Sequence, residues 1–368
     1  MDLSNGALRV GIDGTPLSLK LTGIGRYTYE ICKGLDALLP DARFFVYSKQ
    51  PVVVPAISDR WTYRVDPWRG KKHLKNAAWL KCRAGRLCEE DGIDVFWASG
   101  TLLPRFRSAV RTVSTVYDLN YLVAPDSMAR PTLWAHRLFF RRDVRKADLV
   151  CAISQGTADR LERHLGRKVD AVMPPAVGDS FAVVPQQDID RTLAALGIDP
   201  PYLLALGTLE PRKNLDRLVR AFLNLKQAGA IPGHKLVLVG GKGWRDGALT
   251  RLLQESAGRD VLSLGYVSDE HLPALYGGAD LFVFPSLYEG FGMPVAEALA
   301  CGTRVVCTDS PEIREAGGES PVYVAPTVEG IRCGILQALD TTHRPPVLDP
   351  RWTWTDSAQV LAKLLARH

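Results

Sequence analysis

The sequence predicts an α/β protein of two Rossmann-like, doubly wound domains that face a central cleft, and three observations favour this class. Short apolar, β-branched runs alternate with helical patterns along the chain, which is typical of parallel βαβ units. These runs form two sets of about six, one in each half. The chain of 368 residues is also roughly twice the length of a typical domain of about 100–200 residues.

The predicted strands end at turn residues that precede a helical pattern. In the first half we expect them at Leu8–Ile12, Arg43–Tyr47, Asp94–Ala98, Thr112–Tyr117, Asp148–Ile153 and Val169–Met173. In the second half we expect them at Tyr202–Leu206, Lys235–Val239, Val261–Leu264, Asp280–Phe284, Arg304–Cys307 and Val322–Val324. Ligands of open α/β sheets bind beyond the carboxyl ends of the strands, so the loops after these strands are candidate sites.

The domain boundaries follow from composition. Residues 178–201 are rich in Pro, Gln and Asp and indicate a linker. We therefore expect an N-terminal domain over residues 1–180 and a C-terminal domain over residues 181–345. Residues 346–368 predict a last helix. The sequence does not decide whether this helix crosses back to the N-terminal domain.

Composition excludes several classes of protein. Hydrophobic residues make up 46% and charged residues 23%, which is average for a soluble chain, and no apolar run of about 18 residues predicts a membrane span. No signal-peptide pattern is present, so we expect a cytoplasmic protein. Seven cysteines without CxxC pairs, and histidines without ligand spacing, predict neither a disulfide framework nor a zinc site.

Positive charge is concentrated in the first half. Residues 1–180 carry 28 Lys and Arg against 19 Asp and Glu, whereas the remaining residues carry 18 against 21. Two basic stretches, residues 60–86 and 130–146, contain interleaved Trp or Phe. This pattern favours a peripheral contact with an anionic membrane surface over a solvated helix face with ordinary core aromatics and over nucleic acid. We expect no nucleic-acid partner.

The loop after the strand at Tyr202–Leu206 places two cations before a helix. Arg212 and Lys213 precede Asn214, the expected N-cap of a segment with helical apolar periodicity. A helix N-terminus carries roughly +0.5 charge and disfavours cations. Two cations there favour a phosphate site, with solvent exposure or a pair with Glu210 as the alternative.

The loop after the strand at Asp280–Phe284 predicts a second anion site. Its glycines permit close backbone approach, and Pro294 suits the first helical position. The amides at this helix start, those of Phe291, Gly292 and Met293, then point outward.

Two carboxylates belong to the same segment. Glu289 lies in the loop, and Glu297 lies one turn into the helix in an apolar setting. A buried carboxylate is costly unless it is hydrogen-bonded, and the hydroxyls of a ribose could supply those bonds. The alternative for Glu297 is a capping acid at a helix start.

The segment YEGFGMPVAEALACGTRVV, with its E-x7-E spacing, resembles the signature of the retaining GT-B glycosyltransferases of family 4. LGTLEPRKNL resembles the phosphate-binding segment of that family, and the similarity runs from Tyr202 to Pro326. The first half is similar more loosely, through GIDGTPL, TGIGRYTYEI and TVYDLNYL. The nearest resemblance is to bacterial mannosyltransferase-like members that build O-antigen or exopolysaccharide.

The resemblance implies an N-terminal acceptor domain, a C-terminal nucleotide-sugar domain and a role for each matched residue. Arg212 and Lys213 would hold the donor diphosphate, Glu297 the ribose hydroxyls, and Glu289 the donor sugar. The amides of Phe291, Gly292 and Met293 would surround the hydroxyls and phosphate of the donor. Tyr266 and Val267 would pack against the base. Gly23 and Gly25 would approach the diphosphate, and the alternative for these two glycines is a tight turn.

The implied chemistry needs no cofactor and no metal. Cleavage of the sugar–phosphate bond develops negative charge on the diphosphate, which two cations and fixed amides can stabilise. The sequence Asp188-Ile189-Asp190 spells a DxD metal motif, but it lies in the expected linker and is attributed to chance.

One departure from the family pattern concerns the acceptor side. Where members often have His followed by Asp, this chain has Tyr117 and Asp118. Tyr117 can donate a hydrogen bond but cannot become a cation near neutral pH. Asp118 is a candidate to orient the acceptor hydroxyl or accept its proton, with a turn cap as the alternative.

The sequence thus predicts a hexosyltransferase at the inner face of the plasma membrane. The resemblance favours mannose from GDP-mannose as the donor group and a lipid-linked or saccharide acceptor of bacterial surface polysaccharide. The alternatives are a nucleotide-sugar epimerase on the same scaffold and a non-catalytic nucleotide-sugar-binding protein.

Overall fold

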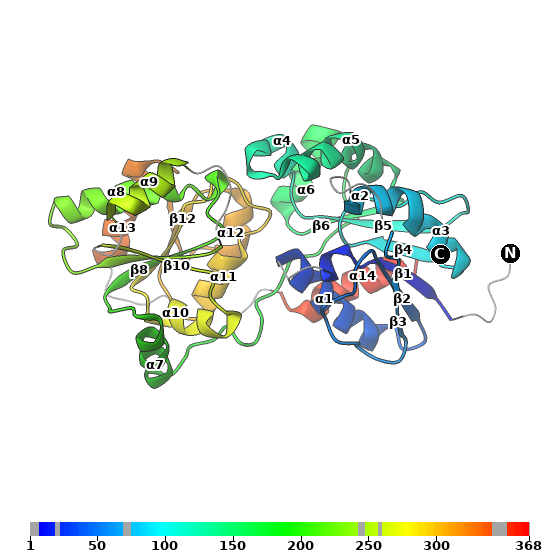
Figure 1. Ribbon diagram of the computed structural model, residues 1–368, viewed down its shortest axis with the longest axis horizontal. Helices are drawn as coiled ribbons and strands as arrows, with labels where there is room; N and C mark the ends of the chain where they lie inside the picture. The colour runs from blue at the N-terminus through cyan, green and yellow to red at the C-terminus, as the bar shows by residue number, and fades with distance from the viewer. Residues whose placement is uncertain are drawn as a thin grey trace. The chain divides into compact units, whose positions relative to one another are not determined.

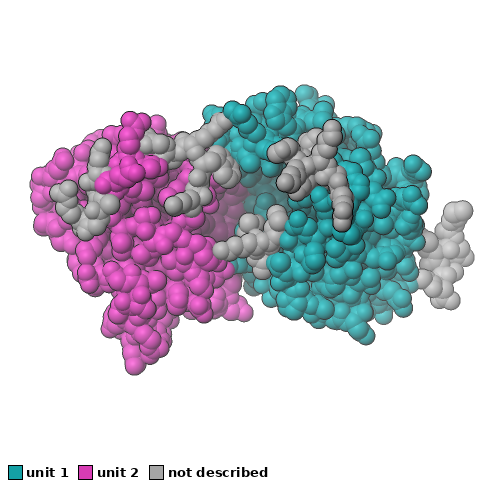
Figure 2. Space-filling model, in the orientation of Figure 1, with its two compact units in different colours: residues 1–175, 352–368 teal, residues 176–351 magenta. Residues whose placement is uncertain are grey.

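Every strand pair in the described part of the chain is parallel, and the strands form two separate sheets flanked by helices (Figure 1). The computed structural model describes residues 7–18, 23–68, 75–241, 247–256, 260–340 and 352–367. Two compact units, coloured separately in Figure 2, comprise residues 1–175 with 352–368 and residues 176–351. The predicted α/β class is confirmed.

The sheet of the first unit has the order β3-β2-β1-β4-β5-β6-β7. Its strands are β1 (Arg9–Asp13), β2 (Arg43–Ser48), β3 (Trp61–Val65), β4 (Val95–Ala98), β5 (Arg111–Val116), β6 (Leu149–Ala152) and β7 (Ala171–Val172). Its helices are α1 (Gly23–Leu38), α2 (Lys75–Trp79), α3 (Gly85–Glu90), α4 (Asn120–Val123), α5 (Arg130–Lys146), α6 (Gln155–Leu165) and α14 (Trp354–Leu365), and a π-helical turn (Leu80–Ala84) joins α2 to α3.

The sheet of the second unit has the order β10-β9-β8-β11-β12-β13. Its strands are β8 (Tyr202–Leu206), β9 (Lys235–Val239), β10 (Val261–Gly265), β11 (Leu281–Phe284), β12 (Val305–Thr308) and β13 (Val322–Val324). Its helices are α7 (Gln186–Leu196), α8 (Leu215–Gln227), α9 (Gly247–Ser256), α10 (Leu272–Gly278), α11 (Met293–Ala300), α12 (Pro311–Gly317) and α13 (Val328–Asp340). Because β8 and β11 are neighbours, the two loops chosen from the sequence leave the same edge of the sheet.

Strand β3 was not among the predicted strands. It begins the first basic stretch, and its Trp61 is buried and stacks on Phe44 with ring centroids 4.3 Å apart. Only one residue of this edge strand is buried, so its sequence lacks the apolar run that marks the inner strands.

The first basic stretch does not form an open basic surface over its described residues. Trp79 is fully buried, and three of its arginines lie within 3.0 Å of a carboxylate: Arg60 with Asp36, Arg83 with Asp66, and Arg86 with Glu90. Its Arg69, Lys71 and Lys72, and the side chain of Lys75, lie outside the described residues. The expectation of a membrane contact is therefore not supported for the described part of this stretch.

The expected linker was wrong in its central part, because that part folds as α7. Ile189 and Leu193 are buried in the core of the second unit. The two acids of the DxD sequence lie on this helix, where Asp188 pairs with Arg191 at 3.1 Å and Asp190 accepts a hydrogen bond from Gln186 at 2.8 Å. Both acids thus have local partners on α7.

The last helix, α14, packs against α1 of the first unit. Thr353 and Asp356 form a capping box at its start, and Ser357 donates a hydrogen bond to the carbonyl of Pro174 at 2.5 Å. A Cβ on Gly34 of α1 would lie 2.4 Å from the Cβ of Ala358, so glycine permits this close packing. The expected boundary at residues 345 and 346 lies outside the described residues.

Candidate functional site

The loops that follow β8 and β11 are in direct contact. The amide of Leu287, after β11, donates to the carbonyl of Arg212, after β8, at 2.8 Å. Arg212 and Lys213 belong to a short 3₁₀ turn (Pro211–Lys213) that immediately precedes α8, as the sequence predicted. This backbone contact brings their side chains to the Glu289 loop.

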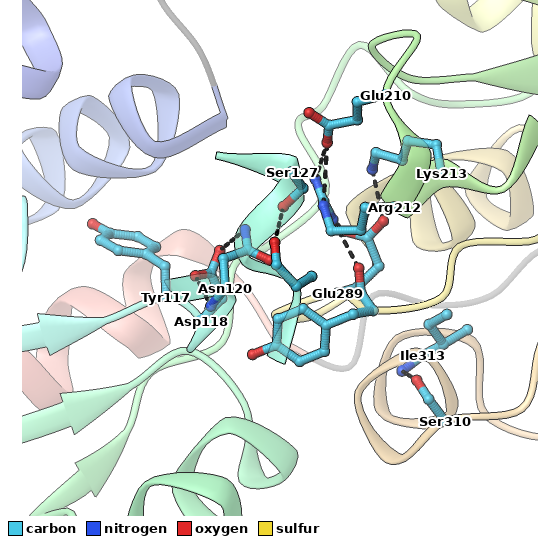
Figure 3. Close-up of polar contacts among 12 residues, drawn as sticks. Tyr117, Asp118, Asn120, Ser127, Glu210, Arg212, Lys213, Glu289, Ser310 and Ile313 are labelled. Carbon is cyan, nitrogen blue, oxygen red and sulfur yellow. Dashed lines mark hydrogen bonds and ion pairs between the residues drawn. The ribbon is translucent and has the colours of Figure 1, made fainter. Parts of the chain in front are cut away.

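Glu289 accepts hydrogen bonds from both cations (Figure 3). Arg212 Nη1 lies 2.7 Å from Oε2 of Glu289, and Lys213 Nζ lies 2.6 Å from Oε1. The three side chains are only 11–14% exposed. The structure therefore brings together three of the predicted site residues in one largely buried ion cluster.

Burial and charge act in opposite directions on this cluster. Burial alone would raise the pKa of Glu289, but the charges of Lys213 and Arg212 outweigh it and lower that pKa to about 2. Burial lowers the pKa of Lys213, and Glu289 opposes that shift. Glu289 is therefore a carboxylate at neutral pH, and it neutralises part of the positive charge of the two side chains.

Glu210 is a member of the cluster that the sequence offered only as an alternative partner for the cations. It is 7% exposed, and its Oε1 accepts from Arg212 Nε at 3.1 Å and from Nη2 at 2.7 Å. Arg212 Nη1 also donates to the carbonyl of Tyr288 at 2.8 Å. Glu210 therefore fixes one edge of the guanidinium while the other edge faces Glu289.

Asn214 occupies the predicted N-cap position of α8, but its side chain does not cap the helix. The residue has a left-handed backbone (φ 57°), and its side chain makes no cap hydrogen bond. Instead, Nδ2 donates to the carbonyls of Pro285 at 3.0 Å and Pro326 at 3.2 Å. Asn214 thus connects the loops that follow β8, β11 and β13.

Helix α11 begins at Met293, with Gly292 as its N-cap at φ 112°, a backbone angle that favours glycine. Pro294 therefore occupies the second helical position rather than the first. The side chain of Phe291 is buried at 4% exposure. Any ligand contact of Phe291 would therefore use its backbone amide, and that contact stays a prediction.

Glu297 is buried, as expected, at 7% exposure. The hydroxyl of Tyr276, on α10, donates to Oε2 of Glu297 at 3.2 Å. This contact supplies one of the hydrogen bonds that a buried carboxylate requires.

The two residues expected at the base differ in exposure. Tyr266 is 59% exposed, whereas Val267 is 7% exposed and belongs to the hydrophobic core of the second unit. An exposed tyrosine ring can stack on a base, but the side chain of Val267 is packed in the core. Val267 can therefore reach a ligand only through its backbone.

The candidates in the first unit occupy local structure. Gly23 and Gly25 lie in the first turn of α1 rather than in the preceding loop, which corrects their predicted position. Asp118 follows β5, and its two oxygens accept from the backbone amide of Asn120 at 2.9 Å and from its side-chain Nδ2 at 3.0 Å. These bonds correspond to the turn-capping alternative, and the acceptor role of Asp118 stays a prediction.

Tyr117, at the position of the family histidine, is 8% exposed. Its hydroxyl is buried near the side chain of Thr28 but makes no hydrogen bond of normal geometry among the described residues. Burial raises the pKa of Tyr117 above its usual range, so the phenol stays neutral.

Among the described residues, no group of three or more His, Cys, Asp or Glu side chains could hold a metal ion. No helix there is long and apolar enough to cross a membrane. All seven cysteines are free thiols, of which five are buried.

Comparison with protein families identifies the class of this protein. Residues 21–178 match the model of Glycosyltransferase Family 4, and residues 188–339 match that of Glycosyl transferases group 1. Together with the two parallel-sheet units, these matches define a GT-B glycosyltransferase. The chain belongs to the group 1 glycosyltransferases.

Several curated relatives are named mannosyltransferases. The chain is 27% identical over 373 residues to the O-antigen chain mannosyltransferase B of Escherichia coli, covering 95% of this chain and 93% of that protein. It is 31% identical over 240 residues to the serotype-specific mannosyltransferase WbdA of Escherichia coli, which is 62% of this chain but only 29% of WbdA.

Solved structures support the same fold. The lipopolysaccharide-biosynthesis glycosyltransferase WaaG has a TM-score of 0.70 at 18% identity, over 97% of this chain and 95% of WaaG. The sucrose-phosphate synthase of Thermosynechococcus elongatus also has a TM-score of 0.70, at 17% identity, over 97% of this chain and 94% of that one. At these identities the similarity establishes the fold alone.

Proposed function

We propose that this glycosyltransferase transfers mannose from GDP-mannose, with retention of anomeric configuration, to a lipid-linked or saccharide acceptor of bacterial surface polysaccharide. The relative named O-antigen chain mannosyltransferase B, similar over nearly its whole length, supports the sugar and the pathway class. A relative in Mycolicibacterium smegmatis, 28% identical over 77% of this chain and 79% of its own length, is named a GDP-mannose-dependent mannosyltransferase. That name supports the choice of donor.

The observation that carries the proposal is the ion cluster of Arg212, Lys213 and Glu289. Two largely buried cations share one carboxylate within 2.7 Å, so an anionic group is already bound where the donor diphosphate is expected. A diphosphate brings more negative charge than one carboxylate and would replace Glu289 as the partner of both cations. Glu289 is then released toward the hydroxyls of the donor sugar.

The chemical step follows from this exchange. The bond between the anomeric carbon and the diphosphate oxygen breaks, and the electron pair remains on the diphosphate. Arg212, Lys213 and the amides at the start of α11 stabilise that charge, while Glu289 contacts the electron-poor sugar. The acceptor hydroxyl forms the new bond to the anomeric carbon and passes its proton to a base, for which Asp118 is the candidate. In this proposal the leaving group needs no metal ion.

The other donor contacts follow the predicted assignments. Glu297, which accepts from Tyr276, would also accept from the ribose hydroxyls. The exposed ring of Tyr266 would stack on the base. In the first unit, Gly23 and Gly25 would approach the diphosphate and Asp118 would orient the acceptor hydroxyl. We place the reaction at the inner face of the plasma membrane, where an anionic lipid-linked acceptor would meet the basic first unit.

The proposal is tested by donor binding and product analysis. A thermal-shift panel of GDP-mannose, UDP-glucose, dTDP-glucose and ADP-glucose should give its largest stabilisation with GDP-mannose. Proton NMR of the product should then show an α-mannoside formed from the α-linked donor. Conversion of the donor sugar without an acceptor would instead identify an epimerase, and a β-mannoside would contradict retention.

A further inference from the structure

We infer that the exposed face formed by α4 and α5 is the surface through which this protein binds an anionic lipid bilayer. This face, the α4–α5 patch, consists of Leu122, Val123, Arg130, Trp134, Arg137, Leu138, Arg141 and Arg142, all of them exposed. The inference extends the membrane location of the proposed function by naming the surface and the lipid chemistry. It does not depend on which sugar is transferred.

Exposed apolar side chains are concentrated on this patch. Four of the ten exposed large hydrophobic residues in the described chain belong to α4 and α5. Leu138 and Trp134 are the most exposed of the ten, at 69% and 64%, and Leu122 and Val123 are 45% and 39% exposed. Single exposed apolar residues are ordinary, but a group on adjoining helices marks an interaction surface.

The positive charge of α5 lies on its exposed side, except that the guanidinium of Arg145 turns back to the carbonyl of Leu165 at 2.7 Å. Arg130, Arg137, Arg141, Arg142, Arg145 and Lys146 are exposed, and the helix contains one acid, Asp143. Asp143 is buried, where it pairs with Lys81 and accepts from the amide of Leu103 at 3.1 Å. The water-facing side of α5 therefore carries cations and no carboxylate.

The cations and the apolar side chains share one stripe of α5. Trp134, Leu138 and Arg141 are spaced at i, i+4 and i+7, which places them along one face of the helix. The guanidinium of Arg137 lies 5.9 Å from the ring centroid of Trp134. A helix of this kind lies in the plane of a bilayer, with its apolar side chains among the acyl chains and its cations at the headgroups.

The opposite face of α5 is held firmly in the first unit. Phe140 and Val144 are buried, and the ring of Phe140 lies 4.7 Å from that of Tyr121 on α4, which lies beside α5 (Figure 1). The buried pair of Lys81 and Asp143 adds a second attachment. Substitutions on the outer face should therefore leave the fold intact.

The mixture of side chains favours lipid over nucleic acid. Cations would suit either phosphodiesters or lipid headgroups, but Leu122, Val123 and Leu138 cannot stack on bases and gain only from burial in an apolar phase. The exposed aliphatic side chains of the patch therefore favour anionic lipid over nucleic acid. Anionic lipid offers both the charge and the apolar phase.

The test is co-sedimentation of the full-length protein with vesicles of equimolar phosphatidylglycerol and phosphatidylcholine, and with vesicles of phosphatidylcholine alone. The wild type should bind the anionic vesicles and lose affinity as salt is added. The double variant Arg137→Gln/Arg141→Gln should bind roughly thirtyfold more weakly. Trp134→Ser/Leu138→Ser should bind roughly tenfold more weakly. The matched control Arg43→Gln/Val53→Ser, at exposed positions outside the patch, should bind like the wild type.

Several results would overturn the inference: no binding of the wild type to anionic vesicles, unchanged binding by both patch variants, or an equal loss in the control. Binding to duplex DNA is measured on the same proteins. Patch variants that lose DNA binding but keep vesicle binding would also overturn the inference. GDP-mannose affinity, measured by calorimetry on the same variants, should not change. Failure of the wild type to bind GDP-mannose would contradict the proposed donor and leave the vesicle result intact.

Discussion

The loops at the carboxyl ends of the strands differ between the two units. In the second unit, charged side chains from the loops after β8 and β11 pair across the sheet edge at 2.6–2.7 Å. In the first unit, Asp118 after β5 accepts hydrogen bonds from the backbone amide and the side chain of Asn120, two residues along the chain. The adjacent Tyr117 hydroxyl makes no hydrogen bond of normal geometry among the described residues. The charges of the second unit are therefore assembled without a ligand, whereas the observed hydrogen bonds of Asp118 in the first unit are those of a turn cap.

The largest effect should follow from removing a cation of the second unit. Lys213→Ala removes one of the two cations that pair with Glu289, and with it one charge from the proposed diphosphate site. We expect kcat/KM for GDP-mannose to fall roughly a thousandfold, because the lost charge acts where negative charge develops. The control is Lys235→Ala, at an exposed lysine that pairs with Asp199. Equal activity of Lys213→Ala and the control would remove the contrast between the units.

The depressed pKa of Glu289 predicts a pH dependence of stability. Its pKa is about 2 in the folded protein against a usual value of 4.5, so its stabilisation is complete above about pH 5 and is lost as pH falls toward 2. This difference corresponds to about 3 kcal/mol. Urea unfolding at pH 5 and pH 3 should show a smaller loss for Glu289→Gln than for the wild type. Glu319→Gln, an exposed change outside the cluster, should follow the wild type.

An intermediate effect should follow from Glu210, which positions Arg212. Glu210→Gln keeps the size of the side chain but weakens its hydrogen bonds with Nε and Nη2 of Arg212, because the negative charge is lost. We expect kcat/KM to fall roughly tenfold to a hundredfold, mainly in kcat, with little change in melting temperature. Asp199→Asn provides the control outside the site. A melting temperature that falls in step with activity would instead indicate a purely structural residue.

The smallest effect should come from Tyr117 in the first unit. Its buried hydroxyl makes no hydrogen bond of normal geometry among the described residues, so Tyr117→Phe should leave the free energy of unfolding unchanged or raise it by up to about 1 kcal/mol. Chemical denaturation measures this directly. A clear loss of stability would show that the hydroxyl is bonded in solution and would weaken the contrast between the two units.

The sequence was most informative where local patterns coincide with tertiary contacts. The inner strands of both sheets are apolar runs, and Arg212, Lys213 and Glu289 lie in loops that follow two such strands. Their meeting follows from parallel strands sharing one edge, which the pattern alone implies.

Other features depend on packing that a single sequence does not reveal. β3 is an edge strand with one buried residue, and α7 has only a short apolar stripe within a polar segment. Glu210 contacts the site because of where the Arg212 guanidinium lies, and the burial of Val267 beside the exposed Tyr266 follows from its place in the core. The two basic stretches also differ in a way that the sequence does not show. Described arginines of residues 60–86 pair with carboxylates, whereas the cations of residues 130–146 are exposed.

The most direct test of the central claim compares GDP with guanosine as ligands of Lys213→Ala. Isothermal titration calorimetry separates the diphosphate from the base, since both ligands share the nucleoside. If the ion cluster holds the diphosphate, Lys213→Ala should weaken GDP binding roughly a hundredfold and leave guanosine binding unchanged. Equal affinities of the wild type and the variant for GDP, or a parallel loss for guanosine, would contradict the account.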